Sequence, residues 1–166
     1  MIDLIARRRE MMGASGALAD NYIYYDVFVP TAGTTRAVYS GKLADIAEMW
    51  MDGVMITPVL SMTFADNGTY SMKVLLNDPS TIPDNALNAS HYRDAILPMC
   101  VTSIGNNAFR NYSATNGNLT CKAITPPTLV GDPFYNRHGL NVYVSSDSLS
   151  AYQTAWNQMT NIQAII

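Results

Sequence analysis

Charged residues are scarce in this chain, at 14% of its 166 residues, which is about half the usual share. The formal net charge is −3, and the only basic run is Arg7 to Arg9, so a basic surface for nucleic acid is not expected. No apolar stretch approaches the roughly 18 residues that a membrane-spanning helix needs. We therefore expect neither nucleic acid nor a membrane span.

Residues typical of catalysis and of metal binding are also few. The chain has no Gly-rich phosphate loop and no nucleophile elbow. His91 and His138 have no cysteine or carboxylate cluster at metal-ligand spacing, and we expect both at the surface. Asp45 and Glu48 could serve a hydrolase as an acid–base pair, but their spacing fits a solvated helix or turn better. We expect no metal, no cofactor and no enzyme activity.

What the chain does contain is typical of β-rich proteins. Apolar residues make up 48%, ten tyrosines are present, and Asn, Ser and Thr supply most of the polarity. Between residues 21 and 78, runs of β-branched, aromatic and alternating residues predict short strands at 22–29, 34–39, 49–55, 59–64 and 70–74. These strands would form a small antiparallel sheet or half-sandwich, which we term the β-module.

Residues 1–20 predict a short basic helix followed by a loose linker. Four apolar residues could share one face of that helix, which is too short to be stable alone. We therefore expect this face to mediate homo-oligomer formation or attachment to another protein, with a frayed terminus as the alternative. The face consists of Leu4, Ile5, Met11 and Met12.

Residues 79–166 contain an internal repeat. The sequence IPDNAL at 82–87 aligns with IGNNAF at 104–109, and that block aligns in turn with LVGDPF at 129–134. A short apolar run follows each block, at 95–97, 119–121 and 140–144. The pattern predicts stacked coils with two buried columns and parallel strands. The columns are Ile82, Ile104 and Leu129, and Leu87, Phe109 and Phe134.

The last residues predict a helix that closes the stack. Leu149, Tyr152, Trp156 and Met159 fall on one apolar stripe, and Ser145 or Ser146 could cap the helix with Asp147 in its first turn. We expect Trp156 to pack on the last coil beside Leu140 or Val142. Such a helix would cover an otherwise open strand edge.

Two groups of residues leave alternatives open. Cys100 and Cys121 are separated by nearly one repeat, so they could form a disulfide or thiol pair, or could be two small apolar core residues. Four ring-bearing residues lie in the turns that lead into the repeat strands. They either form an exposed contact surface or pack inside the turns. They are Tyr92, Tyr112, Tyr135 and His138.

The repeat sequence VTSIGNNAF at 101–109 resembles the "vtsIGxxAF" signature of the BspA-type leucine-rich-repeat proteins of gut and oral bacteria. The segments at 122–129, 142–144 and 151–156 are similar to the terminal cap of that family, "a-x-x-PPtL … iYVP … aYkxaW". Residues 52–54 and 64–74 also look like the β-module that often precedes such repeats. The chain departs from the pattern at Ser145, where proline is usual, and at Leu87, where phenylalanine is usual.

The resemblance implies a mainly β fold with some α. It would comprise a linker at 1–20, the β-module at 21–78, and a short irregular leucine-rich-repeat solenoid at 79–166 with a C-terminal capping helix. Family members are mostly non-catalytic adhesion and binding proteins, so the expected partner is a protein or a surface glycan.

The opening residues also resemble small virion proteins of phages that infect such bacteria. The ALA sequence at 17–19 is similar to a signal cleavage site, but the preceding segment has a poor apolar centre. We therefore favour a virion-associated or cytoplasmic location over secretion. The expected role is that of a virion or surface-appendage component, with a secreted or surface adhesin of the bacterium as the alternative.

Overall fold

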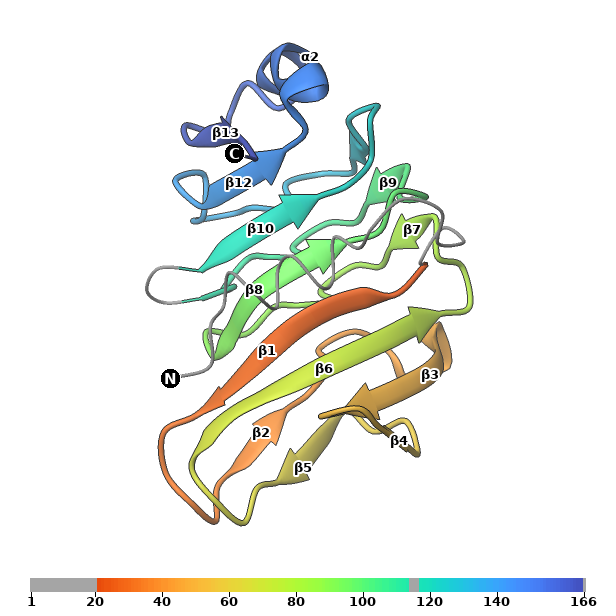
Figure 1. Ribbon diagram of the computed structural model, residues 1–166, viewed down its shortest axis with the longest axis vertical. Coiled ribbons are helices and arrows are strands. Elements are labelled where there is room, and N and C mark those ends of the chain that lie inside the picture. The colour runs from red at the N-terminus through yellow and green to blue at the C-terminus, as the bar shows by residue number, and fades with distance from the viewer. Residues whose placement is uncertain (1–20, 114–116, 166) are drawn as a thin grey trace.

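The computed structural model describes residues 21–113 and 117–165. In these ranges the fold is mainly β, with one short α-helix (Figure 1). The face predicted at Leu4, Ile5, Met11 and Met12 lies outside the described residues. The strands form an eight-stranded sheet of order β13-β12-β10-β8-β1-β6-β3-β4, a three-stranded sheet of order β11-β9-β7, and the pair β2-β5.

The N-terminal half of the large sheet is antiparallel, and its strands alternate between buried and partly exposed residues. Ile23, Tyr25 and Val27 of β1 point into the core, opposite Val74, Met72 and Tyr70 of β6. This period of two is that of a sheet with one face packed and the other turned outward. The elements of this half are β1 (Ile23–Val29), β2 (Thr35–Ala37), a 3-10 helix (Leu43–Asp45), β3 (Ile46–Met51), β4 (Val54–Ile56), β5 (Ser61–Thr63) and β6 (Gly68–Leu76).

One predicted strand is in fact a hairpin. The sequence at 49–55 favours a continuous strand, but Asp52 and Gly53 adopt φ angles of +49° and +83°. A two-residue turn with both φ angles positive joins antiparallel strands closely, and Asp-Gly is a favoured sequence for it. β4 therefore folds back on β3, with Met51 opposite Val54, and forms one edge of the sheet.

The C-terminal half of the large sheet is a parallel ladder. β8 (Tyr92–Leu97), β10 (Asn118–Cys121), β12 (Asn141–Val144) and β13 (Ile162–Ala164) follow one another in the same direction. Ala95, Leu119, Val142 and Ile162 are in register across the four strands, and all four are buried. The predicted stacking of the apolar runs is confirmed, and β13 adds a strand that the sequence did not indicate.

The smaller parallel sheet places the residues of the first predicted column next to one another. It consists of β7 (Thr81–Ile82), β9 (Ser103–Ile104) and β11 (Thr128–Leu129), with Ile82 and Leu129 both in register with Ile104. Ile82 and Ile104 are fully buried. Leu129 is only partly buried, so the expectation of near-complete burial is wrong at that end of the column.

The second column is continuous as well. Leu87, Phe109 and Phe134 are fully buried. The Leu87 amide donates to the Ala108 carbonyl at 2.8 Å, and the Phe109 amide donates to the Pro133 carbonyl at 2.8 Å. Main-chain bonds therefore connect successive turns, which keeps the three side chains in register.

The C-terminal end carries a 3-10 helix (Ser146–Ser148) and α2 (Leu149–Ala155). The predicted serine cap is not formed, because no side-chain capping bond is present at either helix start, and the Ser148 hydroxyl instead donates to the Ser145 carbonyl. Tyr152 and Trp156 are nonetheless buried, as predicted. The Trp156 ring lies 5.4 Å from the Phe134 ring, and its Nε1 donates to the Pro127 carbonyl at 2.9 Å.

No helix in 21–113 or 117–165 is long and apolar enough to cross a membrane.

Candidate functional site

The four ring-bearing residues of the predicted contact surface separate into two pairs. Tyr92 and Tyr112 are fully buried, which corrects the interpretation that all four form one exposed surface. The Tyr112 hydroxyl accepts from the Ala95 amide at 2.6 Å and donates to the Asn118 carbonyl at 2.9 Å. The Tyr92 hydroxyl bonds the Ser40 Oγ at 2.9 Å. Because each buried hydroxyl has a hydrogen-bond partner, these tyrosines can lie inside the fold at little cost.

Tyr135 and His138 remain at the surface, in the turn 130–140 between β11 and β12. The Tyr135 side chain is exposed, and the Arg110 guanidinium lies 4.9 Å from its ring centroid. His138 Nε2 lies 3.3 Å from Asp132 Oδ1, and its side chain is 41% exposed. Asp132 also accepts from the Phe134 amide at 3.2 Å, which anchors the turn to the buried column. We refer to Tyr135 and His138 as the rim.

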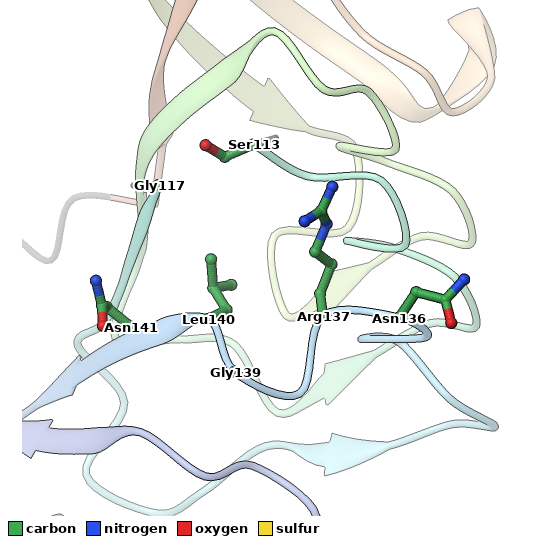
Figure 2. Close-up of a pocket in the computed structure, with 7 residues that line it drawn as sticks. All are labelled: Ser113, Gly117, Asn136, Arg137, Gly139, Leu140 and Asn141. Carbon is green, nitrogen blue, oxygen red and sulfur yellow. The ribbon is translucent and has the colours of Figure 1, made fainter. Parts of the chain in front are cut away.

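The same turn forms one wall of a pocket of about 400 Å³. Figure 2 shows the Arg137 side chain extending into it, with Ser113 and Gly117 across the opening from Asn136 and Leu140. The lining comes from two successive repeats, because residues 113 and 117 precede β10 and residues 136–141 precede β12 or begin it. The lining residues are Ser113, Gly117, Asn136, Arg137, Gly139, Leu140 and Asn141.

Arg137 has an unusual hydrogen-bonding state. Its Nε is buried and has no hydrogen-bond partner in the described structure. A guanidinium has only donors, and an unsatisfied buried donor carries a desolvation cost of about 1–3 kcal/mol. None of the described lining residues is a carboxylate that could serve as the acceptor. The described lining therefore offers the cationic side chain of Arg137, with no carboxylate beside it, to any molecule that enters the pocket.

A ladder of side-chain amides holds the pocket wall. Asn118 Nδ2 donates to Asp94 Oδ1 at 2.6 Å, and Asn141 Nδ2 donates to Asn118 Oδ1 at 3.3 Å. Asn161 donates in turn to Asn141 Oδ1. Asp94, Asn118 and Asn141 lie on three successive parallel strands, and Asn161 immediately precedes the fourth. Asn141 is thereby fixed at the edge of the pocket.

Gly117 is required for the close approach of the two sides of its turn. A Cβ placed there would lie 2.1 Å from the Ser113 Cβ, far inside van der Waals contact. Any larger residue would force Ser113 away from the pocket. The Ser113 hydroxyl accepts from Arg93 Nη1 at 3.1 Å, so a second guanidinium lies behind this wall.

Asp45 and Glu48, the candidate acid–base pair, lie on different elements and have different hydrogen-bond partners. Asp45 ends a 3-10 helix and accepts from the Lys42 amide at 3.0 Å, whereas Glu48 lies on β3 and accepts from the Tyr22 hydroxyl at 2.6 Å. The Tyr22 and Trp50 hydrogen bonds, in that order, lower the pKa of Glu48. Across the described residues, no group of three or more His, Cys, Asp or Glu could hold a metal ion.

The two cysteines are not joined by a disulfide. Cys121 lies on β10 in register with Leu97 and is buried, and burial raises the pKa of its thiol. Cys100 is partly buried, and its Sγ donates to the Pro79 carbonyl at 3.2 Å. Both residues fit the second alternative, in which they are small packing residues.

Sequence reasoning found the rim but missed Arg137 and the pocket. Arg137 is the only charged residue in the described lining, and the opposite side of the pocket, Ser113 and Gly117, comes from about one repeat earlier. Its position between Tyr135 and His138 is the only signal in the sequence. Comparison of the chain with protein-family models, with curated proteins and with solved structures finds no match.

Proposed function

We propose that this chain is a non-catalytic recognition module, with a short leucine-rich-repeat solenoid of the BspA type at 79–166. The two parallel ladders support this proposal, because each apolar position recurs once per repeat and pairs with its equivalents. A solenoid is stabilised mainly by contacts between neighbouring repeats, and here main-chain bonds and buried columns supply those contacts.

The observation that carries the recognition function is the turn 130–140. It combines the exposed Tyr135 and His138 with a pocket into which Arg137 extends. Tyrosine and arginine are enriched at binding surfaces, since each combines a large contact area with directional hydrogen bonds. Phe134 of this turn is buried and stacks on Phe109, and such packing favours a binding surface that needs little ordering when a ligand binds.

The resemblance to bacterial surface proteins and to small virion proteins supports a location in a virion or surface appendage. Its partner in that setting is a surface glycan or protein of a bacterium. Antibody detection in purified phage particles tests the location: co-purification with particles supports it, and absence from them contradicts it.

A binding assay tests the recognition function itself. Fluorescently labelled protein is applied to a printed glycan array and to whole gut and oral bacteria, together with a Tyr135→Ala/His138→Ala double variant. Gln153→Ala, an exposed position on α2, is the control. We expect wild type and control to bind and the double variant to lose binding. Equal binding by all three, or no binding by wild type, would refute recognition through this turn.

A further inference from the structure

We propose that the pocket around Arg137 binds the carboxylate of an acidic sugar about the size of one hexuronic acid. This inference rests on the recognition function proposed above and assigns a ligand class to the same turn.

Arg137 lacks a hydrogen-bond acceptor for its side-chain Nε in the described structure. Its Nε is buried without a hydrogen-bond partner, and the described lining has no acidic side chain. Asp132, the acidic residue of the same turn, is already engaged by the Phe134 amide and lies beside His138. The guanidinium therefore has donor capacity for a ligand, and a carboxylate matches the planar fork of arginine.

The lining favours a carboxylate over a phosphate. A phosphate site usually combines several backbone amides, a helix N-terminus or more than one cationic side chain. The described lining residues include a single cation, Arg137, and the guanidinium of Arg93, which bonds Ser113, is also bonded to Ser90 and Tyr92. One guanidinium balances one negative charge, which is the charge of a carboxylate.

The remaining lining favours a sugar over an acidic peptide. Asn136 contributes an amide and Ser113 a hydroxyl to the lining, groups that both donate and accept, as sugar hydroxyls do. The volume of about 400 Å³ lies at the small-molecule end of ligand pockets. Peptides are usually bound along a sheet edge or in an apolar groove, whereas Leu140 is the only large apolar side chain among the described lining residues.

The test compares ligands that differ in one group. Methyl glucuronide and methyl glucoside share a ring and differ in the carboxylate, so their affinities isolate its contribution. Titrations followed by protein NMR shifts would include N-acetyl-aspartate amide and inorganic phosphate as alternative anions. We expect the glucuronide to bind about tenfold or more tighter than the glucoside, and tighter than either alternative anion.

Variants connect the difference to Arg137. Arg137→Gln should reduce glucuronide affinity about tenfold or more. The affinity of Arg137→Lys should lie between those of wild type and Arg137→Gln, because lysine keeps the charge without the planar fork. Lys42→Gln removes the same charge from an exposed position of the N-terminal half and should bind as wild type does. Melting temperatures of all variants show whether the fold is kept.

Equal affinity for glucuronide and glucoside would overturn the proposal, whatever the variants do. So would tighter binding of the aspartate amide or of phosphate, or an Arg137→Gln variant that folds and binds normally. If wild type binds array glycans or cells but not the glucuronide, the acidic-sugar inference fails and the recognition function stands. If wild type binds neither array, cells nor glucuronide, both fail.

Discussion

Phe109 and Phe134 stack with ring centroids 5.5 Å apart and planes 12° from parallel, although they come from successive repeats of the sequence. Phe109 also meets Tyr112 edge-on at 5.5 Å, and Phe134 contacts Trp156 at 5.4 Å. Aromatic pairs in these arrangements contribute about 0.5–1.5 kcal/mol beyond the burial of their area. One row of rings therefore connects the repeats to the C-terminal helix.

Phe109→Ala should lower the free energy of unfolding by about 3–5 kcal/mol, because it removes a fully buried ring and leaves a cavity between two repeats. That is a large part of the stability of a domain of this size. Phe28→Ala, at a ring that is 39% exposed, is the control and should cost less than about 1 kcal/mol. Urea titrations followed by circular dichroism measure both, and equal effects would show that the column is not a stabilising core.

Removal of residues 146–166 should cause aggregation. The deletion removes α2 and β13, so it unpairs the outer edge of β12 and uncovers Phe134. An open, apolar strand edge pairs readily with other chains. Light scattering of the truncated protein should show large particles at micromolar concentration. A soluble monomer with an unchanged melting temperature would contradict a closing role for this segment.

Stability should decrease below about pH 6.5 because of His91. Burial first, and then the charges of Arg36 and Arg93, lower the pKa of this side chain against the opposing hydrogen bond to Ala37. The unfolded chain therefore binds a proton more readily than the folded one, so stability is complete above the unfolded pKa and is lost as the pH falls toward the folded value. Urea titrations between pH 5 and 8 should show this slope in wild type and a flatter one in His91→Gln; an unchanged slope would assign the effect to other groups.

The native protein should expose one reactive thiol. Cys121 is buried and its thiol pKa is raised, which suppresses the nucleophilic thiolate, whereas Cys100 is only partly buried. A thiol reagent should titrate Cys100 in the native state and both cysteines in denaturant, and Cys100→Ser should remove the native signal. Absence of thiols in denaturant without reductant would show that the two cysteines are oxidised to a disulfide.

The sequence predicted the repeat positions well, because spacing alone determines them. The alignment of the repeats matches Ile82 with Ile104 and Leu129, and the structure places these residues side by side. Strand β1 was predicted within one residue, since its alternation of buried and outward residues is a local property. Where the spacing of apolar residues in the sequence equals the spacing of buried positions in the fold, the sequence alone predicts which residues are buried.

The sequence predictions failed where contacts between residues distant in the chain determine the structure. Tyr112 sits in a turn like Tyr135, yet it is buried because the amide of Ala95 and the carbonyl of Asn118 meet at its hydroxyl. β13 pairs only because α2 brings the chain back beside β12, and a three-residue run has no signal of its own. The pocket joins Ser113 to Arg137 across two repeats, and no local pattern encodes that distance.

The pairing of β1 with β8 limits how the chain can vary in length. β1 runs antiparallel to β8, so the parallel ladder does not continue past β8 on that side, and β13 is the outermost described strand on the other. Within the ladder, a further unit as long as one repeat would meet the same neighbours on both sides. Relatives of different length should therefore differ by whole multiples of that unit, inserted between β8 and β12.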